Sequence, residues 1–99
     1  MQLKRLTTLK DRQVISSLCL YTVKLPSRRL AVIEEVWTHP DHRRQGHSRR
    51  LMIRAIKIAK KLGCECVELT VRQDRPDLQK FYQSLGFFDR LNHAYRLKI

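Results

Sequence analysis

The chain has 99 residues, 42% of them hydrophobic, and carries a formal net charge of +12 from 21 Lys and Arg against nine Asp and Glu. This apolar fraction excludes a disordered basic tail, and the length fits one domain, residues 1–99. No stretch approaches the roughly 18 apolar residues of a membrane span, and the N-terminus lacks the apolar segment of a signal peptide. We therefore expect a cytoplasmic protein without membrane contact, whose positive charge attracts anionic ligands or partners.

The first half of the chain predicts three strands. Residues 3–9 and 14–25 are rich in β-branched residues without a helical period, and the polar turn KDRQ between them indicates a hairpin. Residues 30–38 predict a third strand, which ends before Pro40 because proline cannot donate to a ladder.

The second half predicts helices and strands in alternation. Apolar residues at helical spacing after Gly46 predict an amphipathic helix of about four turns that ends at Gly63. Residues 66–71 predict a strand and residues 75–87 a second helix, while the alternation of Tyr95, Leu97 and Ile99 predicts one or two closing strands. The fold class is therefore α/β, a mixed sheet in the order β-β-β-α-β-α-β, with a parallel crossover in the middle.

Two groups of residues that often bind metals do not predict a metal site here. Cys19, Cys64 and Cys66 match neither zinc-ligand spacing nor paired disulfides, so we expect reduced thiols. His39, His42 and His47 fit no single helix or strand face, and we interpret them as polar groups of a loop.

That loop lies in THPDHRRQGHSRRLM, residues 38–52, between the third strand and the first helix. A helix N-terminus offers unpaired N–H groups and a positive dipole end, and a glycine lets the backbone approach a ligand closely. The spacing matches neither a Walker loop nor a Rossmann fingerprint. On the residues alone, a phosphate-binding loop and the plain start of a basic helix both remain open.

Two segments resemble a known family. IEEVWTHPDHRRQGHSRRLM resembles motif A of the GCN5-related N-acetyltransferases (GNAT), and RPDLQKFYQSLGF resembles a later motif of the same superfamily, with a tyrosine before Gly-Phe. The two motifs occur in the same order and separation, and the resemblance extends over nearly the whole chain from about residue 3. It implies a mixed sheet in which two parallel strands separate to admit acetyl-CoA.

The resemblance also implies roles for individual residues. Tyr82 would protonate the departing thiolate, and Glu34, chosen over Glu35 and Glu68, would act as general base. On the residues alone, packing on an apolar helix face with Leu78, Phe81 and Leu85 is the favoured interpretation of Tyr82, and the family motif reverses that preference. Glu34 and Glu35, as neighbours on a strand, should point to opposite faces. The cofactor would contact the strand end, the loop and the start of the helix: Val36, Trp37, Thr38, Arg43, Arg44, Gln45, Gly46, His47, Ser48 and Arg49.

Three features depart from the family pattern. Ser48 stands where relatives have a small Gly or Ala, and Arg75 stands where many have an asparagine, so that a cation would face the cofactor there. The chain also begins where the family's second strand would lie. We therefore expect an open acceptor site, a second copy or partner chain that completes it, or a loss of acetyl transfer.

Three functions follow from these observations. The first is acetyl-CoA-dependent transfer to a primary amine of a small molecule, peptide or protein. The second is a degenerate scaffold that binds nucleic acid or an acidic protein through the basic helix after Gly46, which has no acidic residue. The third is an acyl-CoA sensor that does not turn over.

Overall fold

The computed structural model describes residues 1–99, which form two compact units, residues 1–69 and 70–99. Seven elements follow one another along the chain: β1 (Gln2–Lys10), β2 (Gln13–Lys24), β3 (Arg29–Thr38), a short 3-10 turn (Pro40–His42), α1 (His47–Lys61), β4 (Cys66–Glu68) and α2 (Pro76–Ser84). No helix is long and apolar enough to cross a bilayer.

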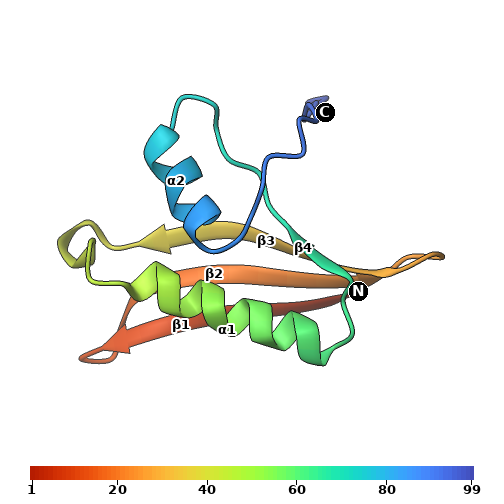
Figure 1. Cartoon of the computed structure of the whole chain (residues 1–99). Coiled ribbons are helices and arrows are strands. Elements are labelled where there is room, and N and C mark those ends of the chain that lie inside the picture. Colours follow the sequence, from red (N-terminus) through yellow and green to blue (C-terminus); the bar gives the residue numbers. More distant parts are fainter. The chain divides into compact units, whose positions relative to one another are not determined.

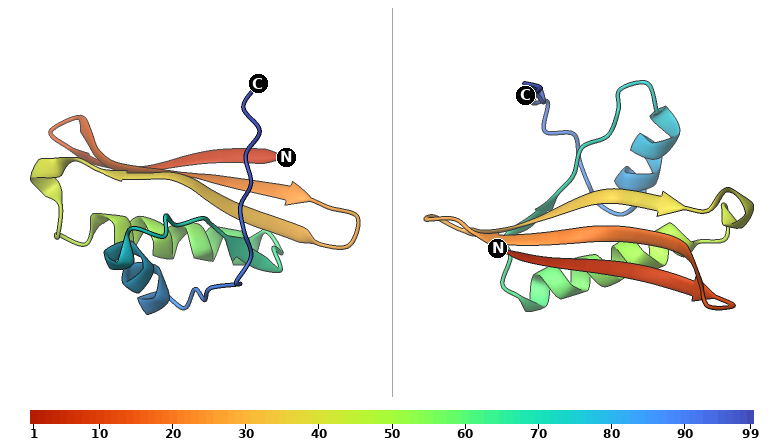
Figure 2. Two further views of the ribbon diagram at one scale, coloured as in Figure 1. Left: turned by 90° about the horizontal axis from the view of Figure 1, so that it is seen from above. Right: turned by 180° about the vertical axis from the view of Figure 1, so that it is seen from behind.

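The first unit is a four-stranded sheet in the order β1-β2-β3-β4 with α1 along one of its faces (Figure 1 and Figure 2). The predicted hairpin is confirmed: Asp11 and Arg12 alone connect β1 to β2, and both have positive φ, as the two-residue turns that match strand twist require. β3 is antiparallel to β2 and parallel to β4, which confirms the crossover through α1.

The core lies between the sheet and α1. Leu51, Ala55 and Ala59 of α1 are buried at intervals of four residues, together with Met52. They pack with buried side chains of the sheet: Leu6, Ile15, Leu18, Leu20, Ala31 and Ile33. The buried stripe is flanked by the partly buried Ile56 and Ile58, and the face of α1 that carries Arg54, Lys57 and Lys61 is exposed.

Two predicted strands differ from the structure. β4 spans only Cys66–Glu68 rather than residues 66–71, and the closing strands predicted after α2 do not form. Tyr95, Leu97 and Ile99 are 93%, 87% and 119% exposed. The prediction was wrong because alternation indicates a strand only where a neighbouring edge accepts its hydrogen bonds and one of its faces becomes buried.

Candidate functional site

A bulge in β3 shapes the middle of the sheet. Cys19 of β2 pairs with Glu34 and Ser17 pairs with Trp37, so Glu35 and Val36 together oppose one β2 residue. Glu35 has a φ of +54°, a conformation unusual for a residue with a side chain. The pairing of β3 with β4 ends at Val32, so β3 continues for six more residues without a β4 partner. β3 therefore has an edge without a hydrogen-bonded partner beyond Val32, and the separation of two parallel strands that the resemblance implied stays a prediction.

The hydrogen bonds at the end of β3 establish which backbone groups face this open edge. The His39 N–H donates to the Ile15 carbonyl at 2.7 Å, and the buried Ser16 hydroxyl donates to the Trp37 carbonyl at 3.0 Å. Trp37 and His39 thus direct their backbone groups toward β2. Because these directions alternate along a regular strand, Thr38, between Trp37 and His39, directs its backbone groups toward the open edge, whereas Val36 belongs to the bulge, where alternation does not apply.

The loop between β3 and α1 has a backbone conformation that is typical of anion-binding loops. Gly46 is the N-cap with a φ of +81°, and Arg44 also has a positive φ of 62°. No side chain caps the helix, and its first turn contains no acidic residue. The first N–H groups of a helix have no intrahelical acceptor, and the dipole makes this end positive. This geometry is typical of anion sites, and the assignment of the loop to the cofactor phosphate stays a prediction.

Arg50 lies over the glycine of this loop. Its guanidinium donates to the Gln45 carbonyl at 3.1 Å and contacts His47 Nδ1 at 2.8 Å. A Cβ on Gly46 would lie 3.0 Å from Arg50 Nη1, so glycine permits both the left-handed backbone and this close approach. Arg43 and Arg44 are also exposed beside the loop.

His47 is held in its neutral form. Since Arg50 can only donate, Nδ1 of His47 accepts, and Nε2 is left to donate to Gln45 Oε1 at 3.1 Å. Desolvation, and then the charges of Arg50, His42 and Lys10, lower the pKa of His47 below its usual value. His47 therefore adds a positive charge to the loop only at a pH below the usual pKa of a histidine side chain.

Three hydroxyls join β2, β3 and α1. The Thr38 hydroxyl lies 3.0 Å from the Ser16 hydroxyl and 2.7 Å from that of Ser48. Each hydroxyl has one proton, and the Ser16 proton goes to the Trp37 carbonyl. Thr38 therefore donates to Ser16, and Ser48 donates to Thr38. Ser48, which departs from the family pattern, thus fastens the first turn of α1 to the end of β3.

The bulge also changes where the two neighbouring glutamates point. Glu34 pairs with Cys19 across the sheet, and the Glu35 carboxylate accepts from the Cys19 thiol at 4.0 Å, so both side chains lie on the Cys19 face. The expectation of opposite faces was wrong, because alternation holds only for regular strands. Both carboxylates are exposed. The assignment of Glu34 as the base stays a prediction.

The second unit contains the other two predicted residues. Tyr82 of α2 is buried, its ring 5.1 Å from that of Phe81 and 6.0 Å from that of Phe87, and burial raises its pKa above the usual value. Arg75, at the start of α2, forms two hydrogen bonds with the Asp77 carboxylate, at 3.0 and 3.1 Å. Tyr82 thus remains a proton donor at neutral pH, whereas the Arg75 guanidinium already has a partner. Their assignment to the cofactor site stays a prediction.

Comparison with known proteins identifies the family. Residues 4–87 match the model of the acetyltransferase (GNAT) family. The chain belongs to this family. It is 35% identical over 72 residues to an uncharacterized N-acetyltransferase, MJ1207, of Methanocaldococcus jannaschii, a match that covers 73% of this chain and 32% of that protein.

Solved structures confirm the fold. A transcriptional regulator from Bacillus halodurans C-125 is 27% identical with a TM-score of 0.89, over 98% of this chain and 66% of that one. A putative acetyltransferase from Agrobacterium tumefaciens is 24% identical with a TM-score of 0.88, over 98% of this chain and 69% of that one. The chain thus spans a third of the length of the curated relative and about two thirds of these structures.

Proposed function

We propose that this GNAT chain transfers an acetyl group from acetyl-CoA to a primary amine of a small molecule, peptide or protein. The observation that carries the proposal is the open edge of β3, which leads directly into the uncapped N-terminus of α1. The open edge suits the amide groups of an extended arm, and the helix N-terminus suits a pyrophosphate. A ligand that carries both groups would fit the two features together.

The residues present fit such a ligand. The arm would add to the open edge as an extra strand does, by hydrogen bonds to the backbone of Val36 and Thr38. The pyrophosphate would accept from N–H groups of the loop and first helical turn, residues 44–49, with Arg43 and Arg44 beside it. When bound, acetyl-CoA supplies the acetyl thioester.

The chain's own groups would then serve the transfer. A backbone N–H at the bulge of β3, that of Val36, would stabilise negative charge on the carbonyl oxygen, a contribution of about 3 kcal/mol in other enzymes. Glu34 would remove a proton from the amine, and the protonated Tyr82 phenol would give one to the thiolate. The net charge of +12 favours encounter with neutral or anionic amines over polycations.

The test is calorimetric titration of acetyl-CoA and CoA at two salt concentrations, followed by turnover with a panel of anionic, neutral and cationic amines. Gly46→Glu should abolish binding, because the carboxylate would repel phosphate at the loop. Gly63→Glu is the matched control, since Gly63 has a similar φ of +78° at the other end of α1 and open space around it. Equal acetyl-CoA affinities in the two variants would refute the loop assignment.

A further inference from the structure

We infer that the outward face of α1 binds the phosphate backbone of double-stranded nucleic acid, at a surface separate from the acetyl-CoA site. This surface, the basic face, consists of Arg54, Lys57, Lys60 and Lys61. It occupies the last two turns of the helix, whereas the loop occupies the other end. The inference does not depend on the proposed acetyl transfer.

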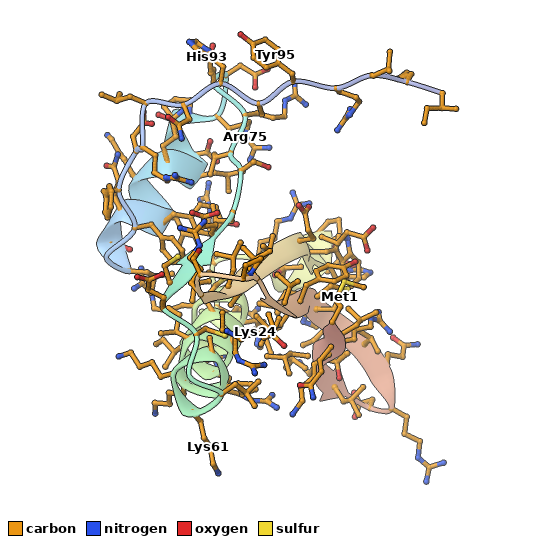
Figure 3. All side chains as sticks on the ribbon, turned by 90° about the vertical axis from the view of Figure 1, so that its right-hand side faces the viewer. Met1, Lys24, Lys61, Arg75, His93 and Tyr95 are labelled. Carbon is orange, nitrogen blue, oxygen red and sulfur yellow. The ribbon has the colours of Figure 1, made fainter.

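The exposure and spacing of these residues form one continuous positive surface. All four are exposed, while the apolar stripe of α1 is buried. Arg54, Lys57 and Lys61 follow one another at intervals of three and four residues, so they lie in a row about 10 Å long. Lys61 projects away from the sheet (Figure 3).

The surrounding sequence maintains the positive field. Residues 43–61 contain eight of the 21 Lys and Arg of the chain, and no Asp or Glu occurs between His42 and Cys64. A solvent-exposed helix usually carries both acidic and basic side chains, because opposite charges three or four residues apart stabilise it. Here like charges at those intervals repel one another. A polyanion relieves this repulsion.

The chemistry of the face selects among polyanions. Insertion of α1 into an anionic membrane needs a broad exposed apolar face, but four apolar residues of α1 are buried, Ile56 and Ile58 are partly buried, and Ile53 alone is exposed, at 39%. A protein partner needs an apolar centre to its interface, which this face also lacks. Single strands bind by stacking on aromatic rings, and α1 contains no Phe, Tyr or Trp, while His47 lies at the opposite end of the helix from this face. Contacts to duplex phosphates need only charge and reach, which the four side chains provide.

The test is fluorescence anisotropy with mixed-sequence DNA and RNA duplexes of about 20 base pairs, at salt concentrations from about 50 to 200 mM. The variant Arg54→Gln/Lys57→Gln/Lys61→Gln is compared with Lys80→Gln/Arg96→Gln/Lys98→Gln, which loses the same charge from exposed positions of the second unit. The first variant should reduce the slope of log affinity against log salt by about 3, and affinity by more than tenfold, for every duplex sequence. The control should keep the wild-type slope.

Two further measurements separate this surface from the acetyl-CoA site. The α1 variant should bind acetyl-CoA as the wild type does, and Gly46→Glu should bind duplex as the wild type does. Binding of either the DNA or the RNA duplex supports the inference. The ratio of the two affinities shows whether the basic face fits the grooves of DNA or those of RNA better. The inference is overturned by absence of duplex binding at the lowest salt, or by equal losses in the two triple variants. It is also overturned if single strands, polyglutamate or anionic vesicles bind as tightly as duplex.

Discussion

Replacing Thr38 by valine tests whether the three hydroxyls hold the loop in place. Valine has nearly the shape of threonine but cannot hydrogen-bond, so the change removes the contacts to Ser16 at 3.0 Å and to Ser48 at 2.7 Å. Thr38→Ser keeps the hydroxyl and loses only a methyl group, which makes it the matched control.

The size of the effect follows from what each partner retains. Ser16 is fully buried but still donates to the Trp37 carbonyl, and Ser48 is partly exposed and can reach water. Neither is left with an unpaired buried proton, so each lost bond should cost about 1 kcal/mol, or about 2 kcal/mol together. For a chain of this size, that corresponds to a fall in Tm of about 10 °C.

Trp37 is the only tryptophan of the chain and precedes Thr38, so its fluorescence during urea unfolding reports on this unit. We expect Thr38→Val to lower the unfolding midpoint without a change in m, and to weaken acetyl-CoA binding. If Thr38→Val and Thr38→Ser differ by less than about 0.5 kcal/mol, the hydroxyls do not fasten α1 to β3.

Three further predictions concern the site. As pH falls below about 6.5, the unfolded state binds a proton before the lowered-pKa His47 does. Stability should therefore decrease with acidification, and a urea-midpoint profile that is equally steep in His47→Asn would contradict this. Gly46→Ala should cost about 1 kcal/mol of left-handed strain and also displace Arg50, so it should weaken acetyl-CoA binding. Gly63→Ala, with the same strain but open space, should not; calorimetry compares the two. Tyr82→Phe should lower kcat by at least about a hundredfold while acetyl-CoA affinity is retained, and unchanged turnover would remove Tyr82 from the mechanism.

The sequence predicts best those parts of the fold that depend on local patterns. The buried positions of α1 follow from helical periodicity, and the turn at residues 11–12 follows from a polar break between two strands. The prediction of closing strands was wrong because a strand also needs a neighbouring strand edge, and none pairs with the segment that contains Tyr95 and Leu97. The bulge at Glu35 is equally invisible, since it arises from how β2 and β3 align.

The candidate site divides in the same way. The loop could be predicted as a phosphate site because its arginines and Gly46 are contiguous and resemble a family motif, and the structure adds the left-handed Gly46 and the uncapped helix start to that prediction. The hydroxyl network was missed, because Ser16 and Ser48 are 32 positions apart and only the fold joins them to Thr38. The pairing of Arg75 with Asp77 had a local signal, opposite charges two residues apart at a helix start, and it was overlooked.

The N-terminus of α1 has no side-chain cap. Most helices begin with a side-chain cap worth about 1 kcal/mol, but here the N-cap is Gly46, which has no side chain. An anion bound at this end would serve as the missing cap. An anion that binds the folded chain and not the unfolded one would also stabilise the fold, by about 2.7 kcal/mol at a hundred times its Kd. Such a ligand would stabilise the helix start from solution, where most helices use a side chain of their own sequence.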